Sequence, residues 1–81
     1  MFLHLGENVM IRTKDIIMIF NIETSSYSSD TTNFLKLAEE DGFVEKIGRE
    51  KLKSCVIAEV SRKSKVFLSP ISSVTLLKRI I

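Results

Sequence analysis

The stretch REKLKSCVIAEVSRKSKVFLSPIS, residues 49–72, decides the fold. It contains two apolar runs, residues 54–60 and 65–68, joined by the short polar link SRKS at residues 61–64. Two apolar runs separated by about four polar residues are typical of an antiparallel β-hairpin. We therefore expect these runs to form two neighbouring strands, with the rest of the chain as the scaffold that presents them.

Basic side chains mark both ends of the expected hairpin. Before the first strand lie Arg49, Lys51 and Lys53, and at the turn lie Arg62, Lys63 and Lys65. A strand pair with cations at its approach and at its tip is suited to an anionic polymer, because phosphate groups attract such side chains whatever the base sequence.

The charge of the whole chain is only +2, but its distribution is uneven. Residues 1–45 carry eight acids and three bases, a net charge of −5, whereas residues 46–81 carry nine bases and two acids, a net charge of +7. Such asymmetry indicates either a basic face for an anionic partner or a self-complementary surface for assembly. The alternative is a solvated surface that happens to be lopsided.

A chain of 81 residues makes one small domain, residues 1–81. Such a chain buries only about 60% of the surface that it exposes when unfolded, so small domains usually depend on a disulfide, a structural metal or oligomerisation. Here Cys55 has no second cysteine to pair with, and Cys55 and His4 alone do not make a zinc site. We therefore expect a homo-oligomer.

The N-terminal segment lacks the pattern of a secretory signal, because Glu7, Arg12, Lys14 and Asp15 interrupt any apolar core. The longest early apolar run, residues 16–20, is far shorter than the ~20 residues that a membrane-spanning helix needs. Because the single cysteine is also unpaired, the expected location is the cytoplasm, without membrane attachment.

The spacing of apolar residues predicts the other elements. Strands are expected at residues 2–5, 8–12, 16–22 and 43–47, and helices at residues 32–41 and from Ser72 or Ser73 onward. The main helix would be capped by Thr31 or Thr32 and ended by Gly42. The polar segment before it, residues 23–32, is expected to be a mobile loop. The fold class is therefore α+β, a mostly antiparallel sheet with one principal helix on a face and a short C-terminal helix.

Some of this apolar surface calls for a partner. Residues 16–22, IIMIFNI, are typical of a strand buried on both faces, one covered by the main helix and the other by a neighbouring subunit. In the last helix we expect four apolar residues to pack against something, namely Leu76, Leu77, Ile80 and Ile81. The acids Glu39, Glu40 and Asp41 crowd the end of the main helix, where the dipole disfavours them. They mark either a salt-bridge contact with another subunit's basic face or an unselected, solvated helix end.

Motifs for catalysis and cofactor binding are absent from the sequence. Gly6, Gly42 and Gly48 are isolated from one another, so no Gly-rich phosphate loop is present. Cys55 lies in the middle of an expected strand, where a buried cysteine behaves as a small hydrophobe rather than as a nucleophile. We expect neither enzymatic activity nor a cofactor or metal.

Three segments resemble the extracellular matrix regulator family, RemA and RemB: LHLGENV at residues 3–9, KDII at residues 14–17 and KVFLSPIS at residues 65–72. The resemblance spans essentially the whole chain and is closest to the RemB branch. It implies a small DNA-binding transcriptional regulator of biofilm and extracellular-matrix genes in Gram-positive bacteria. It also implies a LytTR-like sheet and a ring of subunits around which DNA wraps.

The resemblance carries two contact regions onto this chain. RemA proteins have a DNA-contacting arginine after the second strand, and Lys14 occupies the similar position here. Their second region, a Gly-Arg-Arg-x-Arg loop, resembles residues 48–53, GREKLK, except that lysines replace arginines and Glu50 intrudes. Lysine lacks the bidentate fork of arginine, and Glu50 repels the DNA backbone. With the turn included, the candidate DNA-binding residues are Lys14, Arg49, Lys51, Lys53, Arg62 and Lys63.

Two functions fit these residues. The first is a DNA-binding transcriptional regulator in which a ring repeats a small cationic patch along double-stranded DNA, because multivalency raises avidity without new contacts. The second is a protein–protein assembly module that partners a RemA-type paralogue and does not bind DNA directly. Glu50 and the acidic end of the main helix motivate this second function.

Overall fold

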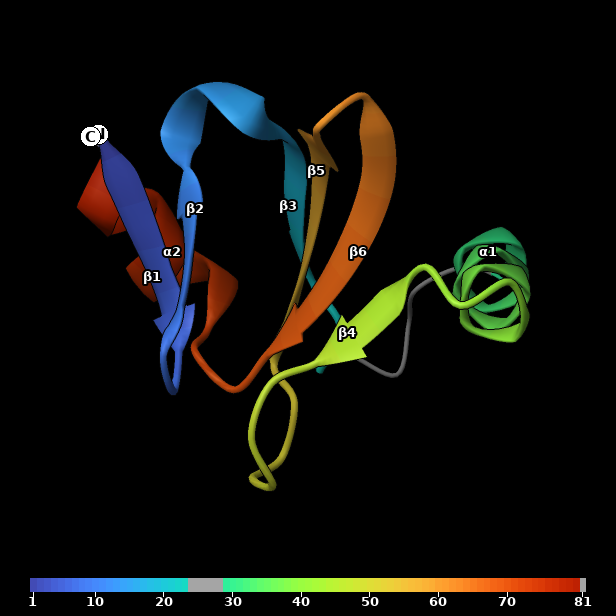
Figure 1. Cartoon of the computed structure of the whole chain (residues 1–81). Helices are drawn as coiled ribbons and strands as arrows, with labels where there is room; N and C mark the ends of the chain where they lie inside the picture. Colours follow the sequence, from blue (N-terminus) through green and yellow to red (C-terminus); the bar gives the residue numbers. More distant parts are fainter. Residues whose placement is uncertain (24–28, 81) are drawn as a thin grey trace.

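Figure 1 shows a computed structural model of the chain, which describes residues 1–23 and 29–80. In chain order its elements are β1 (Phe2–Gly6), β2 (Val9–Arg12), the 3-10 helix η1 (Thr13–Asp15), β3 (Ile16–Asn21), α1 (Ser29–Glu40), β4 (Val44–Lys46), β5 (Ser54–Val60), β6 (Lys63–Ser69) and α2 (Ser73–Ile80). The predicted α+β class, with two helices and mostly antiparallel strands, is confirmed. No helix in the described ranges is long and apolar enough to cross a membrane.

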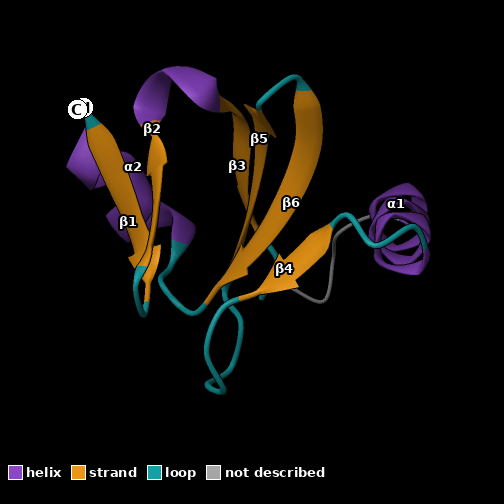
Figure 2. Ribbon diagram, viewed as in Figure 1, coloured by secondary structure: helices purple, strands orange, loops and turns teal. Residues whose placement is uncertain are grey.

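The predicted hairpin of β5 and β6 forms the centre of the larger sheet (Figure 2). The strand order is β3-β5-β6-β4, with β3 and β6 antiparallel to β5, and β4 parallel to β6. β1 and β2 form a separate two-stranded sheet, which confirms the opening hairpin.

The turn of the central hairpin is shorter than expected. It consists of Ser61 and Arg62, with positive φ values of 53° and 66°, so β6 begins at Lys63 rather than at Lys65. Two-residue turns with both φ values positive match the right-handed twist of antiparallel strands. Serine and arginine rarely adopt a positive φ, so the sequence did not indicate a two-residue turn and predicted a four-residue link instead.

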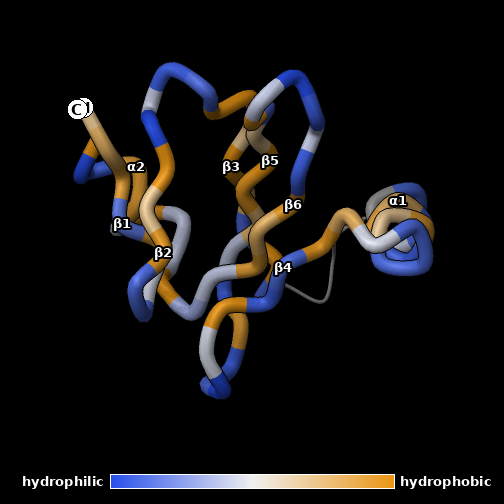
Figure 3. The backbone as a smooth tube through the Cα atoms, viewed as in Figure 1, coloured by the Kyte–Doolittle hydropathy of each residue, from blue (hydrophilic) through white to orange (hydrophobic). Residues whose placement is uncertain are grey.

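Alternation along β5 divides the core into two layers. Val56 and Ala58 belong to the layer that contains the β1–β2 hairpin and α2, where the other buried members are Leu3, Leu5, Ile11, Ile47, Phe67 and Leu76. Cys55 belongs to the opposite layer, where the other buried members are Ala38 of α1, Val66 and Leu68. Figure 3 shows that hydrophobic positions follow the strands and that the connecting loops are mostly hydrophilic.

β3 is an edge strand, and part of it is open in the single chain. Ile17 and Met18 are 60% and 52% exposed, so the single chain does not bury residues 16–22 on both faces, and their expected covering by a neighbouring subunit stays a prediction. Among the described residues, α1 contributes Leu35 and Ala38 to the core layer that also includes Phe20 and Ile22, and Ile17 and Met18 lie outside this layer.

α1 begins at Ser29, so Thr31 and Thr32 lie inside the helix and neither is its N-cap. The apolar periodicity that predicts a helix starts only at Phe34, and a polar first turn is invisible to it. The predicted end is confirmed: Gly42 has a φ of +78°, and its amide donates to the Glu39 carbonyl at 3.1 Å. Of the predicted mobile loop, residues 29–32 are helical and residues 24–28 lie outside the described residues.

α2 is capped by Ser72, whose Oγ accepts a hydrogen bond from the Thr75 amide at 3.2 Å. Leu76 is fully buried and Ile80 packs against the same core, as expected. Leu77 is 46% exposed in the single chain, so its expected packing partner is not within the described residues and its packing stays a prediction. Ile81 lies outside the described residues.

A buried serine ties the opening hairpin to the central sheet. The Ser69 hydroxyl donates to the Leu5 carbonyl at 2.6 Å and accepts from the Ile71 amide at 3.0 Å. The Ser54 hydroxyl donates to the Ile71 carbonyl at 2.7 Å. These bonds set the path of the chain from β6 to α2 and hold β1 beside the sheet.

Candidate nucleic-acid interface

The predicted DNA-binding residues lie at two opposite ends of the β5–β6 hairpin (Figure 1). The turn end, which we call the tip patch, holds Lys14, Arg62 and Lys63. The loop between β4 and β5, residues 48–53, holds Arg49, Lys51 and Lys53, and we call it the base loop. β5 has seven residues, so the two ends are about 20 Å apart. The fold brings Lys14 close to the turn between β5 and β6. The base loop lies at the other end of the hairpin, away from both Lys14 and the turn.

A short helix and a tight turn build the tip patch. Antiparallel pairing of β3 with β5, which sets Ile16 opposite Ala58, places η1 beside the turn that follows β5. A hollow of about 380 Å³ opens there, lined by Arg12, Lys14, Asp15, Ile16, Ile17, Glu59, Ser61 and Arg62. Sequence reasoning missed Arg12 and Glu59, because the pairing of β3 with β5 is a long-range contact that no local pattern indicates.

Positive charge is available in the tip patch. Arg12 Nε donates to Asp15 Oδ2 at 2.9 Å, so the carboxylate at the end of η1 is already paired with a cation. Lys14 and Arg62 are exposed and line the hollow from two sides, with Glu59 as its remaining carboxylate. An exposed cation without an internal partner gives up no existing contact when it binds a phosphate.

The base loop is anchored at both ends but carries more negative charge. The Ile47 amide donates to the Leu68 carbonyl at 2.9 Å, and the Lys53 amide donates to the Ser69 carbonyl at 2.8 Å. Gly48 has a φ of +75°, and a Cβ there would lie 3.0 Å from Glu7 Oε1. Because Glu7 approaches the loop and Glu50 lies within it, two carboxylates accompany its cations. The base loop is therefore the weaker anion site of the two.

Ion pairs separate the structural cations from the available ones. Lys46 Nζ lies 3.1 Å from Glu39 Oε1, and Lys65 Nζ lies 3.0 Å from Glu45 Oε1. Lys65 also lies 5.3 Å from the centroid of the Phe67 ring, so it belongs to the sheet surface rather than to the turn. None of the candidate DNA-binding residues forms an ion pair within residues 1–23 and 29–80.

Cys55 is a core residue. It is fully buried in β5, and desolvation by burial raises the pKa of its thiol to about 12 because it disfavours the thiolate. In the part of the chain that the structure describes, no group of three or more His, Cys, Asp or Glu side chains could hold a metal ion.

We expect Cys55 to react with a soluble disulfide reagent at about pH 8 roughly 10³-fold more slowly in the native protein than in urea, because the thiolate is the nucleophile. The pKa of the folded state lies above the ordinary value of 9.0, so the unfolded chain loses the proton first as the pH rises. The free energy of unfolding therefore falls between about pH 9 and pH 12, and Cys55→Ala lacks this component. Equal labelling rates in native and denatured protein would contradict the burial.

Comparison with known protein families matches residues 2–80 to the RemA-like family, described as extracellular matrix regulatory protein A-like. No curated protein is significantly similar to the chain. The match runs from β1 to α2, so the tip patch and the base loop both lie within it. The finer assignment to the RemB branch stays a prediction. The chain therefore belongs to the RemA-like family of extracellular matrix regulatory proteins.

Proposed function

We propose that this chain is a DNA-binding transcriptional regulator that acts as a ring-shaped homo-oligomer in the cytoplasm and controls biofilm and extracellular-matrix genes. The tip patch is the observation that supports the proposal. Its cations are exposed, and within the described residues they form no ion pair; the domain that carries them is RemA-like. The proposal includes the LytTR-like sheet and the RemB branch that the resemblance implies, and it assigns the chain no catalysis and no cofactor.

Assembly is needed because one subunit offers few contacts. The tip patch and the base loop hold three cations each, and a patch of that size gives weak and strongly salt-dependent binding. A ring repeats the patch along the duplex, so avidity rises without a new kind of contact. Lysine and arginine contacts to phosphate carry no sequence information, so target choice would depend on how readily the DNA bends.

The test is DNA binding by the wild-type protein across a salt series, with the mass of the assembly checked by light scattering. Binding of a long A·T-rich duplex is expected to weaken linearly in log affinity against log salt between about 50 and 200 mM. If one subunit used all of its candidate cations, the slope would be about 5, so a multivalent ring predicts a steeper one. No binding at the lowest salt by an intact oligomer, or a slope at or below this value, would overturn the proposal.

A second function is an assembly module that partners a RemA-type paralogue without touching DNA. The carboxylates of Glu7 and Glu50 at the base loop favour it, because they weaken the anion site there. Size-exclusion chromatography of this chain mixed with a RemA-type protein would then give one mixed species, while this chain alone fails to shift DNA. Separate elution of the two proteins would eliminate this function.

A further inference from the structure

α1 carries an exposed stripe that the described residues of its own chain do not cover. Asp30, Phe34, Leu37 and Asp41 recur at i, i+4, i+7 and i+11, so they lie on one side of the helix. Phe34 is 44% exposed and Leu37 is 60% exposed, and a carboxylate stands at each end of the row. We call these four residues, together with Glu40, the α1 stripe.

α1 lacks support on this side. A helix of twelve residues is marginal in water without tertiary packing, and among its described side chains α1 contributes only Leu35 and Ala38 to the core. Beside the stripe, a hollow of about 280 Å³ is lined by Met18, Phe20, Asp30, Phe34 and Ile57. The exposed apolar surface therefore continues from α1 onto the edge strand β3.

A second exposed apolar surface lies on the outer side of the β1–β2 hairpin. Alternate residues of both strands point into the core, so the others face outward, and Phe2 and Met10 are 61% and 56% exposed. The end of α2 adds positive charge beside them, because Arg79 Nη1 donates to the His4 carbonyl at 3.3 Å. We call this surface the hairpin face; it consists of Phe2, His4, Met10 and Arg79, with Lys78 preceding Arg79 in the last turn of α2.

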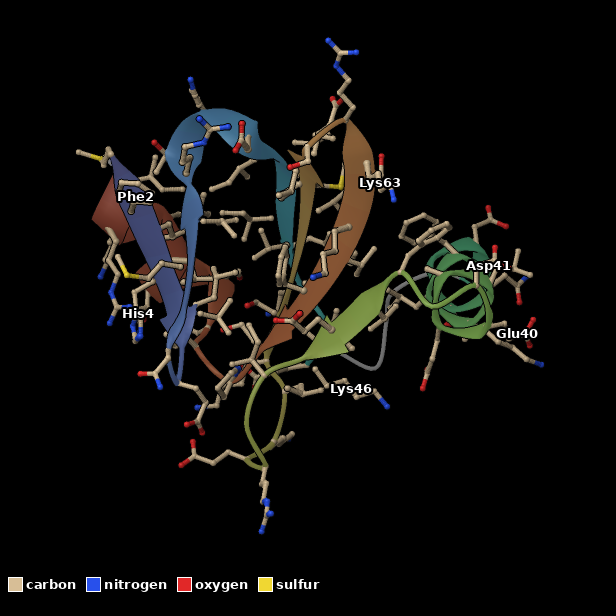
Figure 4. All side chains as sticks on the ribbon, in the orientation of Figure 1. Phe2, His4, Glu40, Asp41, Lys46 and Lys63 are labelled. Carbon is tan, nitrogen blue, oxygen red and sulfur yellow. The ribbon has the colours of Figure 1, made fainter. Side chains whose placement is uncertain are left out.

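We propose that the α1 stripe of one subunit docks on the hairpin face of a second copy of this chain. Figure 4 places Glu40 and Asp41 at one side of the molecule and Phe2 at the opposite side. Within the described ranges, Glu40, Asp41 and Lys78 form no ion pair. Docking covers the apolar residues of both surfaces and sets the carboxylates of α1 against Lys78 and Arg79 of the neighbour.

Charge selects this partner over the symmetric alternatives. Two α1 stripes facing each other would bring like carboxylates together, and two hairpin faces would do the same with cations. Only the mixed contact pairs opposite charges. Such an interface is heterologous, and head-to-tail contacts of this kind close into rings when the rotation between subunits permits.

The inference rests on the proposed function, because it names the interface that repeats the cationic patches. The tip patch and the base loop lie at the two ends of β5, and the hairpin face borders the tip end, because Phe2 and Met10 line a hollow with Asp15 and Ser61. None of the candidate DNA-binding cations belongs to the α1 stripe or to the hairpin face, so head-to-tail docking is expected to leave their side chains accessible. It also sets the tip patches of successive subunits in one row and the base loops in another, so the duplex meets a repeated array.

The experiment uses two variants, each of which damages one surface of the full chain. Leu37→Glu disrupts the α1 stripe and Met10→Glu disrupts the hairpin face; both side chains are exposed, so folding is expected to survive. Light scattering is expected to show each variant alone as a monomer of 9.2 kDa. An equimolar mixture is expected to form a heterodimer of twice this mass and no larger species, because one good interface remains. Mixtures that stay monomeric, or a variant that keeps the wild-type mass, would overturn the inference.

A charge-reversal experiment distinguishes a lost interface from a variant that fails to fold, because a second reversal on the opposite surface is expected to restore assembly. Glu40→Lys/Asp41→Lys and Lys78→Glu/Arg79→Glu each weaken assembly alone, and all four changes in one chain restore it, because the signs match again. Circular dichroism confirms folding of each variant before its mass is measured. If the four-fold variant assembles no better than either double variant, the charge pairing is wrong.

These measurements contain no DNA, so the interface and the proposed function fail separately. A wild-type assembly that passes the mixing test but does not bind DNA leaves the interface standing and removes the regulator. DNA binding by a wild-type monomer would contradict the proposed interface and would indicate a protein that binds DNA without assembling.

Discussion

Replacing Lys14 and Arg62 together by alanine is expected to weaken binding of the assembled protein to a long duplex by about 100-fold at about 150 mM salt. Both side chains line the same hollow at the tip patch, and each is lost from every subunit in the assembly. The slope of log affinity against log salt is expected to fall by about 0.9 for every phosphate contact removed. Fluorescence anisotropy of a labelled duplex measures the affinity and the slope.

The matched control is Lys36→Ala/Lys46→Ala, which removes the same charge from the outer side of α1 and from β4. It is expected to change the affinity by less than about threefold, because only the screened long-range field is altered. Arg49→Ala/Lys51→Ala measures the base loop in the same way, and its effect is expected to be smaller because Glu7 and Glu50 lie there. An equal loss in the control and the tip variant would mean that overall charge, and not the tip patch, determines binding.

Local patterns predicted the strands well, because alternation and turn residues act over a few neighbours. The boundaries of β5 agree with residues 54–60, and the opening hairpin and a serine cap at residue 72 or 73 were also predicted. The first turn of α1 was missed because it is polar and makes no periodic signal. β3 is partly exposed in the single chain, and the covering of this strand by a neighbouring subunit stays a prediction, because apolar composition does not indicate which chain covers a surface.

The candidate site could be predicted only as a collection of residue types. Lys14 and Arg62 share a hollow because β3 pairs with β5, a contact across a large separation in sequence. Lys65 belongs to the sheet surface because alternation in β6 sets it over Phe67 and beside Glu45. Proximity in sequence therefore grouped Lys65 with Arg62, which the fold separates. It also separated Lys14 from Arg62, which the fold brings into one hollow.

Replacing Phe67 by alanine is expected to lower the free energy of unfolding by about 3–5 kcal/mol, whereas the same change at Phe34 costs the single chain less than about 1 kcal/mol. Phe67 is 4% exposed and packs in the layer between the sheet and the opening hairpin, so its removal leaves a cavity. Phe34 is 44% exposed on the α1 stripe. Urea unfolding at fixed protein concentration measures both values.

The two variants separate the core of the fold from the surface that joins subunits. Because docking links folding to assembly, the unfolding midpoint of the wild type is expected to rise with protein concentration. Phe34→Ala is expected to lose most of that dependence while its dilute midpoint stays near the wild-type value. Phe67→Ala is expected to lower the midpoint at every concentration and to keep the dependence for as long as the chain folds. A Phe34→Ala variant with unchanged concentration dependence would show that α1 does not carry the contact between subunits.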